Sequence, residues 1–101
     1  MISQKLLEQM IQKYGESKQL DIAIEECSEL IKAISKFKRE ENKTDIPLRI
    51  ASIAEEEADV RIMLEQIDIM MLKYDPEYNS RVRCEMQRKE QRIRNILLGI
   101  K

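Results

Sequence analysis

Residues 45–73, DIPLRIASIAEEEADVRIMLEQIDIMMLK, hold the longest run of helical spacing in the chain. Thr44 or Asp45 can cap such a helix, and Pro47 is tolerated in its first turn. At 1.5 Å per residue, about 27 residues form a helix of ~40 Å. An apolar stripe runs along this helix, made of Ile50, Ile53, Val60, Met63, Ile67 and Met70.

Further apolar residues lie outside that stripe, namely Ile62, Leu64, Ile69, Met71 and Leu72. A helix that is apolar nearly all round is expected to be buried nearly all round. A chain of 101 residues forms one modest core, which cannot easily cover this helix alone. We therefore expect a second copy of the chain to cover it, in a homodimer or a homotetramer.

The sequence predicts further helices on both sides of this segment. Helical spacing covers residues 2–14, with Gly15 as a stop, and resumes from about residue 17 to residue 39. Asp75-Pro76 can start a last helix that ends near residue 98. Strand alternation is absent, and only two Gly and two Pro occur. The expected fold is all-α, a single domain over residues 1–101 that forms a four-helix bundle.

Two pairs of acidic residues, Glu26 with Glu29 and Glu56 with Asp59, lie within the apolar stripes of their helices. Members three residues apart project from one face of a helix. Burying four carboxylates is very costly unless positive charge compensates them. A hard divalent cation takes oxygen ligands, and Mg²⁺ is usually held by a few carboxylates and the phosphates of a substrate. The pairs therefore indicate an enzyme that acts on a phosphate compound.

Each pair also has a plain structural explanation. The chain is 37% charged, and most acidic pairs on such helices are solvated or form ion pairs.

Histidine is missing altogether. Its absence excludes Ser-His and Cys-His catalysis and His-containing zinc sites. Any chemistry must use carboxylates, basic residues and a metal ion.

The motifs Gln19-Leu20, Ile24-Glu25-Glu26-Cys27-Ser28-Glu29-Leu30 and Glu56-Glu57-Ala58-Asp59-Val60 resemble those of a known family. They are similar to the MazG-like all-α nucleoside triphosphate pyrophosphohydrolases, over about residues 14–94. The resemblance implies Mg²⁺, with Mn²⁺ as a substitute, on Glu26, Glu29, Glu56 and Asp59. It also implies cleavage between the α- and β-phosphates of a nucleotide, with Glu26 or Glu29 as the catalytic base and Gln19 in substrate binding.

The family also places basic residues on its last helix to hold phosphate oxygens. The corresponding residues here are Arg81, Arg88, Lys89 and Arg92. Arg suits bidentate contact with phosphate, but a solvated basic tail explains each residue equally well. The chain has no Trp to stack on a base. The aromatic residues that could replace it are Tyr14, Phe37, Tyr74 and Tyr78.

The bulk charge is nearly balanced, with 18 Lys and Arg against 19 Asp and Glu, a net charge of −1. This balance predicts no nucleic-acid polymer and no membrane as a partner. We expect no signal peptide and no membrane span, and hence a cytoplasmic protein. Cys27 and Cys84 are far apart in sequence and form no CxxC unit, so free thiols at small core positions are expected.

The leading hypothesis is thus a Mg²⁺-dependent (d)NTP pyrophosphohydrolase that yields a nucleoside monophosphate and pyrophosphate. A phosphoribosyl-ATP pyrophosphohydrolase uses a similar scaffold and chemistry on another substrate. A non-catalytic helical interaction module is the alternative from a different class, and it predicts no dependence on metal. A small helical chorismate mutase fits the length but gives no reason for four acids within apolar stripes.

Overall fold

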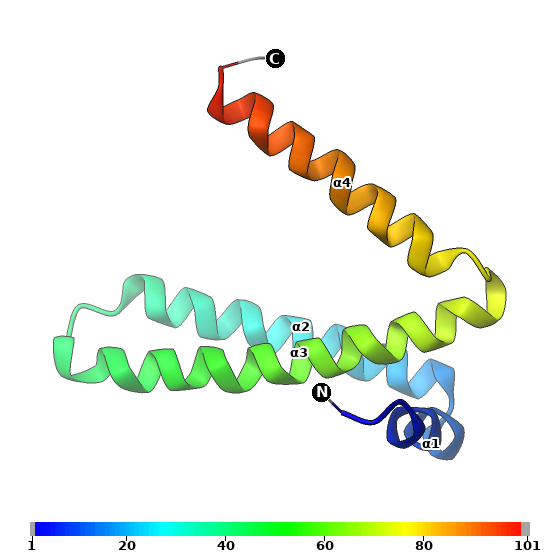
Figure 1. Ribbon diagram of the computed structural model, residues 1–101. Helices are drawn as coiled ribbons and strands as arrows, with labels where there is room; N and C mark the ends of the chain where they lie inside the picture. The colour runs from blue at the N-terminus through cyan, green and yellow to red at the C-terminus, as the bar shows by residue number, and fades with distance from the viewer. Residues whose placement is uncertain (1, 100–101) are drawn as a thin grey trace. The chain divides into compact units, whose positions relative to one another are not determined.

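The computed structural model describes residues 2–99, and within them every regular element is helical. The helices are α1 (Gln4–Tyr14), α2 (Glu16–Arg39), the short 3₁₀ turn η1 (Lys43–Asp45), α3 (Ile46–Tyr74) and α4 (Tyr78–Leu97) (Figure 1). The predicted all-α fold and the four predicted helical segments are confirmed. The chain divides into two compact units, residues 1–69 and residues 70–101.

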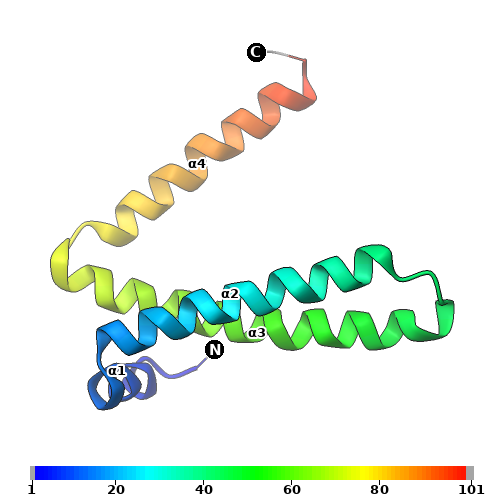
Figure 2. The same cartoon turned by 180° about the vertical axis from the view of Figure 1, so that it is seen from behind.

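In the first unit, α2 and α3 lie side by side and run in opposite directions (Figures 1 and 2). The helix α1 contacts α2, and its Leu7 is buried. Gly15 separates α1 from α2 with a φ of 88°, a backbone conformation that glycine adopts without steric cost. The amide of Gly15 donates to the carbonyl of Ile11 over 2.7 Å and so ends α1.

The turn between α2 and α3 is stabilised by side chains that sequence analysis did not select. Asn42 Oδ1 accepts hydrogen bonds from the Thr44 amide, at 3.0 Å, and from Thr44 Oγ1, at 2.7 Å. Asn42 thus caps η1, the turn through which the chain enters α3 at Ile46, directly after Asp45. Arg49 Nε donates to Glu40 Oε1 over 2.7 Å and joins the end of α2 to the first turn of α3.

The second unit begins with the end of α3 and continues into α4. Asp75 Oδ1 accepts from the Glu77 amide at 3.0 Å, and its other carboxylate oxygen pairs with Arg81. Asp75 thus forms a local turn, and α4 starts two residues after Pro76, at Tyr78. No residue of α4 is buried. Among the described residues, no helix is long and apolar enough to span a bilayer.

Two predictions about burial are wrong in part. Met63 and Met70 of the predicted α3 stripe are buried, but Ile50 is exposed and Gln66 is buried instead. Cys27 and Cys84 are free thiols as predicted, but both are exposed rather than in the core. Cys27 lies one helical position beyond Glu26, which faces α3, and a step of one residue rotates a side chain about 100° around the helix.

Candidate functional site

The candidate site lies where the facing residues of α2 and α3 meet. On α2, Gln19, Ala23 and Ala33 are buried and Glu26 and Leu30 are partly buried, with spacings of four and three residues. This spacing is that of a helix packed against an antiparallel neighbour. On α3 the matching residues are Glu56, Asp59, Met63 and Gln66, of which the last two are buried.

A buried hydrogen bond marks the register of the two helices. Gln19 Nε2 donates to Gln66 Oε1 over 2.7 Å, and the two side chains are almost wholly buried. Glu26 follows Gln19 by seven residues, and Asp59 precedes Gln66 by seven. Seven residues return a helix to nearly the same face, so the Gln19–Gln66 register brings Glu26 opposite Asp59.

Glu26, Glu56 and Asp59 form an acidic cluster, in which one carboxylate oxygen from each lies within 4.8 Å of the others. All three side chains are partly buried. Within residues 2–99, no Lys or Arg forms an ion pair with any of them. Three acids from two helices therefore share a small volume without a compensating basic side chain.

The electrostatics of the cluster follow from this crowding. Burial raises the pKa of Glu26 above its ordinary value, and the Asp59 carboxylate raises it further through its charge and a hydrogen bond. Burial also raises the pKa of Glu56, with added repulsion from Asp59, Glu55 and Glu29. Each carboxylate thus disfavours ionisation of its neighbours, and a bound cation would relieve that repulsion.

Glu29, the fourth predicted ligand, lies beside this cluster but outside it. Its carboxylate receives a hydrogen bond from Lys32 Nζ at 3.3 Å, one helical turn along α2. Its charge still contributes to the raised pKa of Glu56. The structure therefore brings together three of the four predicted ligands and keeps the fourth within electrostatic range.

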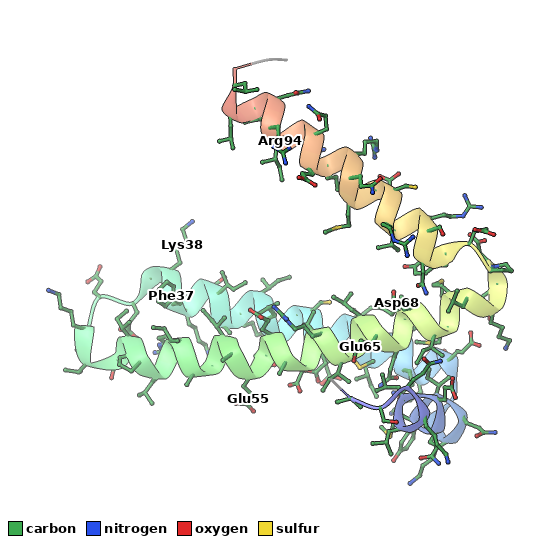
Figure 3. The ribbon with its side chains drawn as sticks, in the orientation of Figure 1. Phe37, Lys38, Glu55, Glu65, Asp68 and Arg94 are labelled. Carbon is green, nitrogen blue, oxygen red and sulfur yellow. The ribbon has the colours of Figure 1, made fainter. Side chains whose placement is uncertain are left out.

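The other predicted site residues lie elsewhere. Gln19 is buried between α2 and α3, and Gln66 is its hydrogen-bond partner. Arg81, Arg88, Lys89 and Arg92 are all exposed on α4, in the second unit. Arg81 pairs with Asp75, and Arg88 pairs with Glu85. Tyr14, Phe37 and Tyr74 are exposed, Tyr78 is partly buried, and Phe37 lies near the end of α2 (Figure 3).

A second acidic pair on α3 was not among the predicted site residues. Glu65 and Asp68 have the same spacing as Glu56 and Asp59, and both project from the part of α3 labelled in Figure 3. Burial, and then repulsion from Glu65, raises the pKa of Asp68. The glutamate–aspartate spacing could have identified this pair. In the described part of the chain, only Glu26, Glu56 and Asp59 bring three potential ligand atoms together.

The donor set of the acidic cluster fits a hard divalent cation. It offers carboxylate oxygens alone, which is the ligand type that Mg²⁺ and Mn²⁺ prefer. Three protein ligands also leave coordination positions for water and phosphate oxygens.

A scan against family models, a search of curated proteins and a search of solved structures find no match to the chain.

Proposed function

We propose that the protein is a Mg²⁺-dependent nucleoside triphosphate pyrophosphohydrolase of the MazG-like type. The observation that carries the proposal is the acidic cluster, in which Glu26 of α2 and Glu56 and Asp59 of α3 bring carboxylate oxygens within 4.8 Å. Two acidic motifs that are 26 residues apart in sequence meet across one helix pair, as the resemblance implies.

Glu26, Glu56 and Asp59 would hold the cation. When bound, the cation supplies positive charge to phosphate oxygens and acidifies water. Glu29 lies beside the cluster, where Lys32 orients its carboxylate at 3.3 Å. This position suits the acceptance of a proton from a water molecule that attacks the nucleotide. Arg81, Arg88, Lys89 and Arg92 of α4 remain the candidates for contact with phosphate oxygens.

The proposed reaction breaks the bond between the α- and β-phosphates. Water adds to the phosphorus atom of either the α- or the β-phosphate, and the P–O bond from that phosphorus to the bridging oxygen breaks. The water gives up a proton to Glu29, and the products are a nucleoside monophosphate and pyrophosphate. The proposal includes completion of a four-helix bundle by α4 and by a further copy of the chain.

The test is a hydrolysis assay with each common ribo- and deoxyribonucleoside triphosphate, with and without Mg²⁺, that separates pyrophosphate from phosphate as product. Glu56→Gln should lower turnover by about 100-fold or more, the scale on which loss of one electrostatic partner acts in active sites. Glu57→Gln is the matched control, because Glu57 is exposed and pairs with Arg61 at 2.8 Å.

Two outcomes would count against the proposal. Equal turnover in Glu56→Gln and Glu57→Gln would show that the acidic cluster takes no part in hydrolysis of the nucleotide. Absence of Mg²⁺-dependent hydrolysis with every nucleotide, and with phosphoribosyl-ATP, would favour a non-catalytic helical module.

A further inference from the structure

The charge of α2 changes sign along its length. Residues 16–29 contain five acids (Glu16, Asp21, Glu25, Glu26, Glu29) against Lys18, a net charge of −4. Residues 30–39 contain four bases (Lys32, Lys36, Lys38, Arg39) and no acid, a net charge of +4. The helix therefore has an acidic half, which carries Glu26 of the acidic cluster, and a basic half that runs to its end.

The part of α3 beside this basic half does not neutralise it. Arg49 of α3 pairs with Glu40, which directly follows α2, so the start of α3 lies beside the end of α2. Residues 46–54 of α3 contain Arg49 and no acid. Between the acidic cluster and the turn, the helix pair thus carries an excess of positive charge, which attracts anions.

Two of the bases continue the helical row on which Glu29 lies. Glu29, Lys32 and Lys36 follow spacings of three and four residues, which place them on one face of α2. Lys32 Nζ reaches back to Glu29 Oε1 at 3.3 Å, in keeping with the tilt of helical side chains toward the N-terminus. Within residues 2–99, Lys36 forms no ion pair. Lys32 and Lys36 are here called the basic row.

The basic row begins where the acidic cluster ends. Glu29 lies one turn beyond Glu26, and Lys32 and Lys36 each lie about one further turn along α2, ~5.4 Å per turn. A phosphate chain that starts at the cluster and follows this face would meet the two ammonium groups in order. The Lys32 ammonium has three donors, so it can contact Glu29 and a phosphate oxygen at the same time.

The charge of α2 also distinguishes the two directions in which a nucleotide could lie. With the phosphates toward the turn, charge-assisted hydrogen bonds from the basic row can hold them. With the phosphates toward the start of α2, they would lie beside Asp21 and Glu25, whose charges repel them. The uncharged nucleoside is the part of the substrate that the acidic half tolerates.

We propose that the phosphate chain of the nucleotide lies along the basic row, with Lys32 in contact with the β-phosphate and Lys36 in contact with the γ-phosphate. Lys36 then favours triphosphates over diphosphates, because a diphosphate does not reach it. This assignment rests on the proposed function.

Calorimetric titration of the intact protein with inorganic tripolyphosphate and with pyrophosphate, both in Mg²⁺, tests the row without a nucleobase and without turnover. Lys36→Met should weaken tripolyphosphate binding by about tenfold or more, the loss expected for one hydrogen bond to a charged group. It should change pyrophosphate binding much less, whereas Lys32→Met should weaken the binding of both.

Lys38→Met is the matched control. Lys38 belongs to the same basic half, but it lies two residues from Lys36, about 200° around the helix, and points away from α3 (Figure 3). Its loss should leave both affinities nearly unchanged. In the hydrolysis assay, Lys36→Met should raise KM for the triphosphate with little change in kcat, as the loss of uniform binding does. Lys36→Arg, which keeps the charge, should restore KM.

The outcomes separate this inference from the proposed function. Equal weakening of tripolyphosphate binding by Lys36→Met and Lys38→Met would overturn the inference, and so would a wild type that does not bind tripolyphosphate. Nucleotide hydrolysis with an unchanged KM in Lys36→Met would overturn it and leave the proposed function intact. Lys36-dependent binding of tripolyphosphate without hydrolysis of any nucleotide would support the basic row and count against the proposed function.

Discussion

The ionised carboxylate of Glu26 lowers the stability of the folded protein at neutral pH. Burial raises the pKa of this carboxyl group, and the nearby charges of Asp59, Glu56 and Glu25 raise this pKa further. The folded state therefore binds a proton at Glu26 more tightly than the unfolded state does. The resulting contribution to stability is fully present below the ordinary pKa of 4.5 and is lost as the pH rises through the raised value.

Glu26→Gln should consequently raise the melting temperature at neutral pH in the absence of divalent cations. The substitution keeps the shape of the side chain and removes one of the repelling charges. The gain should shrink as the pH falls toward 4.5, because wild-type Glu26 is then protonated as well. Thermal melts followed by circular dichroism at several pH values measure the difference.

Glu57→Gln again serves as the control for this measurement. It removes only a surface ion pair with Arg61, which is worth about 0–1 kcal/mol, and should produce no gain. Destabilisation by Glu26→Gln at neutral pH would instead identify Glu26 as part of a structural ion pair.

At the scale of the helices, we expect the buried Gln19–Gln66 hydrogen bond to select how α2 and α3 are aligned. A buried polar pair in an apolar helix interface is a known device for selecting one register. Both amides are buried, and Gln19 Oε1 has no partner among the described residues. The interface therefore contains an imperfectly satisfied polar group at the position that aligns the acidic cluster.

Gln19→Ala should destabilise the fold by about 1–3 kcal/mol, because it leaves the amide of Gln66 buried without its partner. The double variant Gln19→Leu with Gln66→Leu should recover this stability, since both polar groups are gone. Its helices should be free to shift, which would separate Glu26 from Asp59. Urea unfolding measures the stability, and the effect of Mg²⁺ on the melting temperature reports the alignment.

The double variant distinguishes two roles for Gln19. A double variant that responds to Mg²⁺ as the wild type does would show that the apolar contacts alone select the register. If Gln19 binds substrate, as the resemblance to the MazG-like family implies, the double variant should lose affinity for nucleotide even where its response to Mg²⁺ is intact.

At the scale of the whole molecule, folding and cation binding should be coupled. The acidic cluster exists only where α2 and α3 are packed together, so a cation bound there favours the folded chain. Added Mg²⁺ should raise the melting temperature in proportion to the logarithm of its concentration. The stabilisation reaches about 2.7 kcal/mol at a hundredfold excess over Kd.

Glu56→Gln should weaken this response, and Glu57→Gln should preserve it. Differential scanning calorimetry in a Mg²⁺ series, with Na⁺ matched for ionic strength, separates specific binding from general screening. A melting temperature that is the same at zero and millimolar Mg²⁺ would contradict a cation site at the cluster.

The sequence alone determined the secondary structure of this protein. Gly15 predicted where α1 ends, and Pro47 and Pro76 lie near the starts of α3 and α4. Such signals act within a few residues and can be recognised without knowledge of the rest of the chain. The spacing of the acidic residues likewise showed that Glu26 and Glu29, and Glu56 and Asp59, share helix faces.

Only the tertiary structure decided which of these acids meet. Periodicity defines a face of α2 and a face of α3, but it does not state which turn of one helix lies against which turn of the other. That register depends on contacts between residues distant in sequence, such as the hydrogen bond of Gln19 with Gln66. For the same reason Glu29 lies beside Lys32 rather than within the cluster. Cys27 is exposed because α3 packs on the neighbouring face of α2.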